Sequence, residues 1–157
     1  MLIPQNHELR MSELLIFMAS SLDEVEVPVA AVVFNEELDK VAESTNQREM
    51  NTDPTAHAEI VALRNAATSL GRWNLTGCTM YVTLEPCLMC AGAILESKIS
   101  RLVFGAFDTK KSFNLSGNEI LRESGQKIEV IGGVLEKKCH LVMSNWFEHL
   151  RQNKGNI

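Results

Sequence analysis

The sequence lacks an apolar run long enough to cross a bilayer, which takes about 20 residues. The best candidate, 14–19, is short and follows Arg10, Ser12 and Glu13 instead of a basic segment. A secretory signal would combine basic residues, a longer apolar core and small closing residues. We therefore expect no membrane association, a first helix at the N-terminus and a cytoplasmic protein.

Cysteine is scarce, with four residues in a chain of 157. A disulfide framework needs an oxidising compartment and is typical of shorter chains. In a cytoplasmic protein, the spacing Cys87-x-x-Cys90 is more typical of a metal site or a redox pair, and composition does not choose between them. Cys78 and Cys139 stand alone in apolar surroundings, and we expect both to be buried and inert.

An excess of basic residues is also missing. The formal net charge is −5, from 15 Lys and Arg against 20 Asp and Glu. This argues against a protein coated in cations for non-specific nucleic-acid binding. A local basic patch remains compatible with it, because binding depends on how charge is distributed. The candidate pairs, for which a solvated surface is the simpler explanation, are Lys110 with Lys111, Lys137 with Lys138, and Arg151 with Lys154.

The order of periodic segments predicts an α/β fold in a single domain spanning 1–157, since no repeat, low-complexity tract or linker interrupts the chain. Strands that alternate with helices favour a sheet covered on both faces, with the later strands parallel. Polar residues 46–52 are expected to form a loop. Asp53 and Pro54 are expected to open the second helix, and Gly71 to end it. The predicted helices are 5–22, 53–70, 87–97 and 135–150, and the predicted strands are 25–34, 40–45, 79–84, 102–104 and 128–131.

Two short motifs lie at the starts of predicted helices: His57-Ala58-Glu59 and Pro86-Cys87-Leu88-Met89-Cys90. Both follow loops at one edge of the sheet, where ligand crevices form in open α/β folds. Cys87 and Cys90 share one helical face, and the helix N-terminus favours their thiolates. Two thiolates and the His57 imidazole would leave one tetrahedral position of a zinc ion open, which marks a catalytic site.

Glu59 lies two residues after His57, near the open position without being a ligand. Zinc lowers the pKa of a bound water toward neutrality, so that it becomes a hydroxide nucleophile. A neighbouring carboxylate can carry the released proton to a ring nitrogen and then to departing ammonia. Alone, Glu59 would be an ordinary acidic residue near a helix N-terminus. Beside His57 and the cysteines, we predict that it is catalytic.

The alternatives for the cysteine pair are a redox site and half of a zinc finger. A redox pair would not require His57 and Glu59, and a finger would require a second cysteine pair. Neither explains the whole set. The combination of His-x-Glu with Pro-Cys-x-x-Cys is the signature of zinc-dependent nucleobase deaminases.

Longer stretches around these motifs resemble the bacterial tRNA adenosine deaminases of the cytidine and deoxycytidylate deaminase superfamily. They are 27–29, Asn46, 53–60, 81–93 and 103–106. The resemblance implies a three-layer α-β-α, cytidine-deaminase-like fold with a mixed five-stranded sheet and helices on both faces. It also implies a homodimer, one zinc per subunit, and hydrolytic deamination of adenosine to inosine at the wobble position of the tRNA anticodon stem-loop.

The resemblance also assigns roles by matching position. His57, Cys87 and Cys90 would bind zinc and Glu59 would shuttle protons. The residues that would contact the substrate are Asn46, Asp108, Val29 and Ala58.

For two of these substrate residues a structural explanation remains open, since Asn46 could simply terminate a strand and Asp108 could cap a turn. Phe107 stands where family members often have arginine. Together with Phe113, it could stack on unpaired bases or pack in the core.

Two other functions remain open. The first is a guanine or free-nucleoside deaminase on the same scaffold. The second is a zinc-stabilised RNA-binding module without turnover, against which the presence of Glu59 and the lack of a fourth ligand at metal spacing both argue.

Overall fold

Five strands form one mixed sheet at the centre of the molecule, in a computed structural model that describes residues 6–109 and 117–154. The strand order is β2-β1-β3-β4-β5. The first two strands form an antiparallel hairpin, β1 also pairs antiparallel with β3, and β3, β4 and β5 run parallel. The strands are β1 (Ala30–Phe34), β2 (Lys40–Thr45), β3 (Thr79–Leu84), β4 (Arg101–Ala106) and β5 (Glu129–Ile131).

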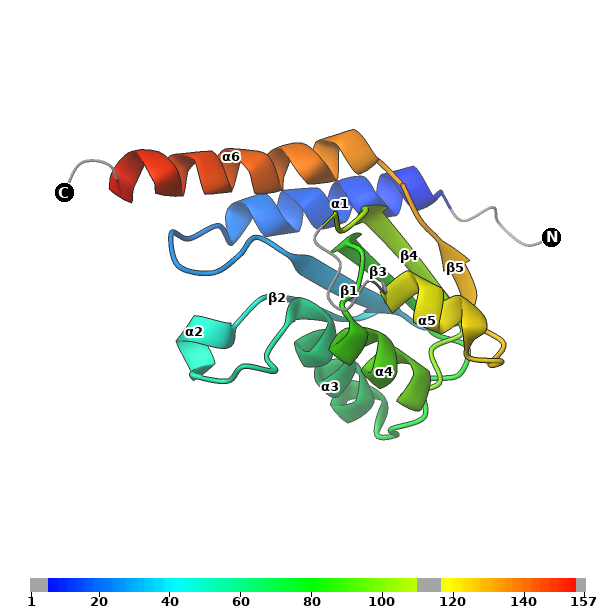
Figure 1. Cartoon of the computed structure of the whole chain (residues 1–157). Coiled ribbons are helices and arrows are strands. Elements are labelled where there is room, and N and C mark those ends of the chain that lie inside the picture. The colour runs from blue at the N-terminus through cyan, green and yellow to red at the C-terminus, as the bar shows by residue number, and fades with distance from the viewer. Residues whose placement is uncertain (1–5, 110–116, 155–157) are drawn as a thin grey trace.

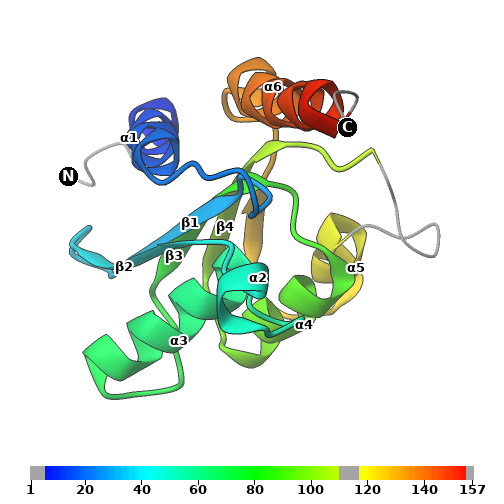
Figure 2. The same cartoon turned by 90° about the vertical axis from the view of Figure 1, so that its left-hand side faces the viewer.

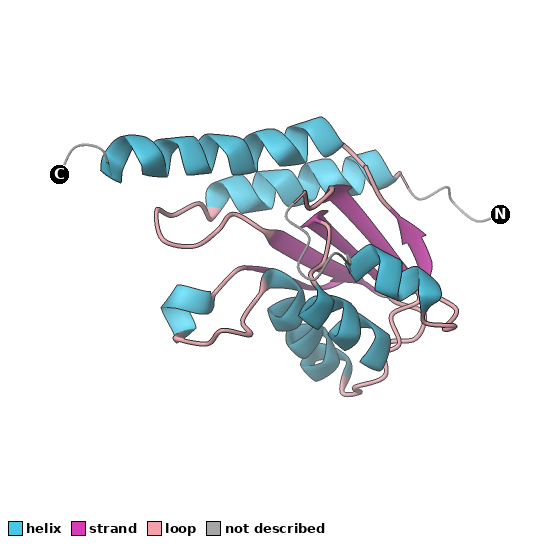
Figure 3. Ribbon diagram, in the orientation of Figure 1, coloured by secondary structure: helices cyan, strands magenta, loops and turns pink. Residues whose placement is uncertain are grey.

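Helices cover both faces of this sheet, as Figures 1 and 3 show and as the side view in Figure 2 shows again. The helices α1 (His7–Ser20) and α6 (Glu136–Lys154) lie on one face, and α3 (Ala58–Leu70), α4 (Leu88–Glu96) and α5 (Gly117–Glu123) on the other. The short α2 (Arg48–Asn51) stands apart from the sheet. The predicted three-layer α/β architecture, including its parallel later strands, is confirmed.

The core consists of two apolar layers, one on each side of the sheet. Alternate residues of a strand face opposite sides, so Val33 and Val82 pack toward α3 and α4 while Val32 and Tyr81 pack toward α1. All five residues of β1 are buried. This explains the unbroken apolar run that the sequence shows there. In the part of the chain that the structure describes, no helix is both long and apolar enough to span a membrane.

The second predicted helix begins later than expected. Asp53 does not cap it: its Oδ1 accepts hydrogen bonds from the backbone N–H and the hydroxyl of Thr55, at 2.8 and 2.7 Å. Such short-range bonds are the competing use of Asp side chains, and they favour turns. The helix α3 starts at Ala58 with His57 as its N-cap residue, and it ends at Gly71 as predicted, in the left-handed conformation.

Other differences are small in extent. Residues 25–29 precede β1 instead of forming part of it, and the expected loop 46–52 contains α2. The helix α5 was not predicted, and α6 runs four residues beyond its expected end at residue 150. The Lys110–Lys111 pair and Phe113 lie outside the described residues.

Candidate metal centre and active site

Two helix starts bring the predicted metal ligands together. His57 is the N-cap residue of α3 and Cys87 is the N-cap residue of α4, and neither side chain caps its own helix. The side chains of His57 and Cys87 can therefore interact with each other. Cys90 lies one turn into α4 and is fully buried, at 0% exposed. Only Glu85 and Pro86 separate the end of β3 from Cys87. The site therefore lies just beyond the carboxyl end of a central strand, where ligand crevices form in such sheets.

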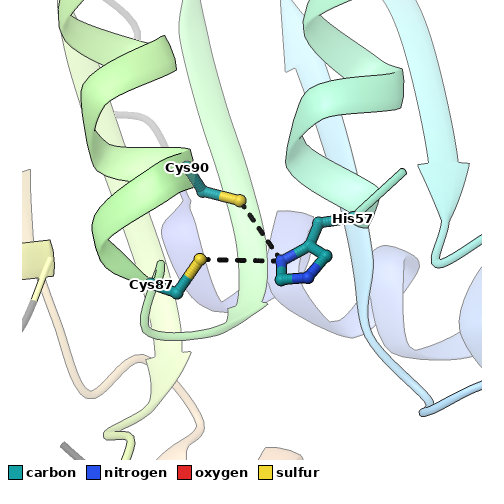
Figure 4. A group of neighbouring side chains, drawn as sticks. All are labelled: His57, Cys87 and Cys90. Carbon is teal, nitrogen blue, oxygen red and sulfur yellow. Dashed lines mark hydrogen bonds between the residues drawn. The ribbon is translucent and has the colours of Figure 1, made fainter. Parts of the chain in front are cut away.

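The three side chains converge on one point, as Figure 4 shows. The Nδ1 atom of His57 lies 3.6 Å from Cys87 Sγ and 3.5 Å from Cys90 Sγ. The three ligand atoms all lie within 4.8 Å of one another. Zinc bonds of about 2.0 Å to nitrogen and about 2.3 Å to sulfur in a tetrahedron separate the two ligand atoms by roughly 3.5 Å. The donor set and its spacing therefore fit one tetrahedral zinc ion.

The electrostatics of this cluster favour a thiolate at Cys87. Hydrogen bonding from the Cys90 thiol lowers the pKa of Cys87 to about 4, and His57 acts in the same direction. The same interaction with Cys87, followed by burial, raises the pKa of Cys90 well above its usual range. The pair thus shares a proton, which a bound cation would displace because metals bind the thiolate form.

Glu59 belongs to the same cluster. Its side chain is 4% exposed in the first turn of α3, and it interacts with Cys90 and with the charges of Cys87 and His57. Burial, the largest influence, raises the pKa of Glu59 to about 7. A carboxyl group that titrates near neutrality can both accept and donate a proton. The structure therefore places a carboxyl group whose pKa suits proton transfer directly beside the candidate ligands.

The described residues contain no second group of three His, Cys, Asp or Glu side chains near enough to share an ion. Cys78 is buried just before β3, at the opposite end of that strand from Glu85. Cys139 is buried in α6 beside Gly105. His149 also lies in α6, with its ring near Glu24. Both lone cysteines are thus buried, as predicted, and outside the cluster.

Three of the four predicted substrate residues form one connected unit beside His57. The N–H of Asn46 donates to the carbonyl oxygen of Val29 at 3.1 Å. The Oδ1 of Asn46 accepts from the N–H of Ala58 at 3.0 Å. Asn46 is 7% exposed, Val29 6% and Ala58 0%. Asn46 therefore connects the end of β2 to the start of α3. This connection holds in place His57, the residue before Ala58.

Asp108 approaches from the other side, just beyond the end of β4. Its N–H donates to Oε2 of Glu85 at 3.0 Å, and the N–H of Glu85 donates to the Ala106 carbonyl oxygen at 2.8 Å. Glu85 is 4% exposed and lies two residues before Cys87. This buried carboxylate therefore links the turn that carries Asp108 to the turn that carries the metal ligand.

Phe107 packs against the core with part of its surface exposed, and stacking on an unpaired base stays a prediction. Its ring packs edge-on against the buried Phe104 ring, with 5.0 Å between centroids, yet the residue remains 43% exposed. Lys137 and Lys138, in the first turn of α6, are exposed, as is Arg151 in its last turn.

Sequence reasoning missed Glu26 and Glu85, both buried carboxylates that accept backbone hydrogen bonds near the site. Glu85 adjoins the Pro-Cys motif, so its proximity to the site was available as a signal. Nothing in the sequence around Glu26 distinguishes it from its acidic neighbours.

Comparison with known proteins adds a family and several relatives. Residues 4–106 match the family described as the cytidine and deoxycytidylate deaminase zinc-binding region. The tRNA-specific adenosine deaminase of Haemophilus influenzae is 44% identical over 131 residues, which are 82% of this chain and 76% of that protein. The protein of the same name from Bacillus subtilis is 41% identical over 150 residues, 94% of this chain and 92% of that one.

Solved structures show the same likeness. A structure from a study of A-to-I editing by tRNA:A34 deaminases at the wobble position matches with a TM-score of 0.75 and 36% identity, covering 84% of this chain and 96% of that one. The guanine deaminase of Bacillus subtilis matches less well, with a TM-score of 0.58 and 30% identity over 69% of this chain and 67% of that one. The guanine deaminase of Nitrosomonas europaea shares the fold with a TM-score of 0.77 at 24% identity, covering 93% of this chain and 85% of that one. The fold is therefore common to both kinds of protein, and it is the sequence identity that is higher to the tRNA deaminases, at 36–44%.

Proposed function

Because the chain belongs to the cytidine and deoxycytidylate deaminase family, we propose that it converts adenosine to inosine at the wobble position of a tRNA anticodon, in the cytoplasm. The reaction consumes one water and releases one ammonia. The proposal rests on one observation above all: a buried carboxylate, Glu59, lies against a His57–Cys87–Cys90 cluster whose spacing fits zinc. The identity of 41–44% to tRNA-specific adenosine deaminases supports the substrate class.

We propose that His57 through Nδ1, with the thiolates of Cys87 and Cys90, holds one zinc ion per subunit. When bound, such an ion lowers the pKa of a coordinated water and so supplies a nucleophile at neutral pH. Three protein ligands leave one coordination position for that water. In a structural zinc site a fourth side chain would occupy this position. His57 and Cys87 are held by the starts of two helices, so the ligand geometry is set by the fold.

Glu59 carries the protons. Its carboxylate takes one proton from the attacking water and gives it to the ring nitrogen next to the carbon under attack, as the C–O bond forms. It then takes the second proton from the new hydroxyl group and gives it to the amine, so that the C–N bond breaks, a C=O bond remains and ammonia leaves. Burial against Cys90 keeps this carboxyl group away from bulk water, so that its protons go to the substrate.

The purine is held by residues on both sides of the cluster. The Oδ1 of Asn46 is already engaged by Ala58, so Asn46 would offer its side-chain NH₂ group to an acceptor of the base. Val29 and Ala58 would form the apolar wall of the pocket, since each is almost fully buried beside Asn46. Asp108, held through its N–H by Glu85, would contact the RNA strand next to the reactive nucleotide.

We propose further that two copies pair. The groove between α3 and α4 is lined by Ile60, Leu63, Ala67 and Ala93 together with Trp73, which is 67% exposed. Apolar, aromatic surface of this kind is typical of protein interfaces. The molar mass measured by light scattering should correspond to two chains, and Trp73→Glu should shift it toward one.

The function is tested by comparing substrates. Zinc-loaded protein should form inosine in a synthetic anticodon stem-loop with adenosine at the wobble position, and free guanine, adenosine and cytidine should not turn over. Turnover of free guanine alone would favour the guanine deaminase. Binding of the RNA without turnover by the zinc-loaded protein would favour the non-catalytic module.

A further inference from the structure

The short helix α2 lies on the connection between β2 and His57, and its position requires an explanation. None of its residues is buried, and the side chain of its N-cap residue, Gln47, caps no backbone N–H of the helix, although its Oε1 accepts a hydrogen bond from the side-chain NH₂ group of Asn51 at 3.0 Å. A helix of four residues is far too short to be stable alone. No packed face fixes α2, so contacts from elsewhere must hold it.

The main contact comes from Glu26, in the segment between α1 and β1. One carboxylate oxygen, Oε1, accepts hydrogen bonds from the N–H groups of Glu49 at 2.7 Å and Met50 at 3.0 Å. These belong to the second and third residues of α2, whose amides have no partner within a helix. Glu26 is 8% exposed, and its own N–H donates to Asp23 Oδ1 at 2.6 Å. A charged, buried acceptor with two donors makes strong hydrogen bonds.

Two backbone hydrogen bonds hold the ends of the connection, one to this segment and one within the connection itself. The Val29 carbonyl oxygen accepts from the N–H of Asn46, and the N–H of Gln47 donates to the Ala56 carbonyl oxygen at 2.9 Å. Backbone hydrogen bonds thus hold the ends of the connection together next to His57, and the Glu26 carboxylate holds α2 in its middle. Gln47 directly precedes α2 and Ala56 directly precedes His57, so this hydrogen bond places the start of α2 near the metal ligands.

The outer surface of α2 has chemistry suited to RNA. Met50 is 69% exposed, and Arg48, two residues before it, is also exposed. A guanidinium pairs well with phosphate, and an exposed apolar side chain can pack against an unstacked base.

We propose that Glu26 is a positioning residue: its carboxylate fixes α2 as a wall of the entrance to the active site, so that Arg48 and Met50 meet the RNA strand flanking the reactive adenosine. This inference rests on the proposed function, because it concerns how the same site receives its substrate. Glu26 itself contacts neither the reacting atoms nor the metal ligands. Its loss should therefore weaken RNA binding and leave the chemical step intact.

The test compares Glu26→Ala with the unmodified protein on the synthetic anticodon stem-loop. We expect KM to rise about tenfold and kcat to stay within about twofold, with unchanged zinc content. Glu26→Gln keeps an oxygen acceptor of the same reach and should restore most of the loss. Glu24→Ala is the matched control, because the Glu24 side chain is 75% exposed and its ion pair is with His149 in α6; its KM should be unchanged.

A double-mutant cycle decides whether Glu26 acts through α2. In an Arg48→Ala/Met50→Ala background, the further change Glu26→Ala should add almost nothing to KM, because the contacts that it positions are already gone. Amide exchange at Glu49 and Met50 should accelerate in Glu26→Ala. The proposal would be overturned if Glu26→Ala raised KM by the same factor in the Arg48→Ala/Met50→Ala background as in the unmodified protein. It would also be overturned if Glu26→Ala lost kcat and zinc together, or if it left KM unchanged.

Two further outcomes are separable. If Glu26→Ala does not fold, the Arg48→Ala/Met50→Ala variant carries the test, and an unchanged KM in it overturns the inference. If the unmodified, zinc-loaded protein does not deaminate the stem-loop, the proposed function fails first, and this inference fails with it. An active protein whose variants keep the normal KM refutes the inference alone.

Discussion

The Oδ1 atom of Asn46 accepts a hydrogen bond from the backbone N–H of Ala58 at 3.0 Å. Ala58 opens α3 immediately after His57, so one side chain at the end of β2 satisfies an amide that the helix leaves unpaired. The two explanations for Asn46 that the sequence left open are therefore compatible. Its carbonyl oxygen has a structural partner, while its NH₂ group is assigned to the substrate in our proposal.

Two substitutions of Asn46 separate these roles. Asn46→Asp keeps an acceptor for Ala58 and removes the NH₂ donor, so we expect normal thermal stability and zinc content with a strongly lowered kcat/KM. Asn46→Ala removes both, and should also lower the free energy of unfolding by about 1 kcal/mol, the typical loss for a capping acceptor. Thermal melts and steady-state kinetics on the stem-loop provide the check. Full activity in Asn46→Asp would remove Asn46 from substrate binding.

Replacing Glu59 tests the proton shuttle. Glu59→Ala should retain the fold and the zinc, because Glu59 is not among the three converging ligands. It should lose activity by a factor of about 10² to 10⁴, the usual contribution of general acid–base catalysis. Metal analysis and single-turnover measurements of inosine formation on the same preparation check both halves. A variant with normal turnover would exclude Glu59 from the mechanism.

The metal ligands can be tested against a matched set of cysteines in the same chain. Cys87→Ser and Cys90→Ser should lose zinc and activity together, since each removes one of three ligands. Cys78→Ser and Cys139→Ser alter buried cysteines outside the cluster, so zinc content should stay at one per chain. Chelation should abolish the activity of the unmodified protein, and added zinc should restore it. Zinc lost equally from all four variants would contradict the assignment.

The nearness of Cys87 to Cys90 and the order of strands and helices were predictable from the sequence because both follow from short-range patterns. Cys87 and Cys90 share a helical turn whatever surrounds them, and the buried strands are continuous apolar runs. The start of α3 was not predictable, because Asp53 can either cap a helix or close a turn with Thr55, and tertiary contacts decide. Glu26 escaped notice for a related reason. Its partners lie 23 and 24 residues away in the chain, beyond the reach of local patterns.

Acid should destabilise the protein partly through His7. Its Nδ1 lies 2.9 Å from the hydroxyl of the buried Tyr81, and burial, with the charge of Arg101, lowers the pKa of His7 below 6.5. Below about pH 6.5 the unfolded chain therefore binds a proton more readily than the folded one, so stability falls as the pH drops. His7→Gln should weaken this fall. Denaturant titrations at pH 7 and pH 5 measure it.

A second variant separates the causes at His7. Tyr81→Phe keeps the burial, which is the largest cause of the lowered pKa, and removes only the hydroxyl. Most of the acid sensitivity should therefore remain in Tyr81→Phe. An equal loss of stability between pH 7 and pH 5 in His7→Gln and the unmodified protein would show that other groups account for it.

Gly105 should prove to be a packing residue, although it lies in a stretch, 103–106, that also carries the family resemblance. A Cβ atom at this position would overlap the Cys139 sulfur and would lie 2.7 Å from the carbonyl oxygen of Thr83. The backbone of β4 cannot move away, because it is paired with β3 on one side and β5 on the other. Overpacking of this kind costs about 1–3 kcal/mol. Gly105→Ala should therefore lower the melting temperature by roughly 2–4 °C for each kcal/mol lost.

A compensating change shows which contact matters. Cys139→Ala removes the overlapping sulfur, so Gly105→Ala/Cys139→Ala should recover part of the lost stability. The remaining loss should persist, because the close contact with the Thr83 carbonyl oxygen is still present. Zinc content and kcat/KM should stay normal in both variants, because α6 meets β4 on the face of the sheet opposite to α3 and α4. Unaltered melting in Gly105→Ala would mean that α6 can shift freely over the sheet.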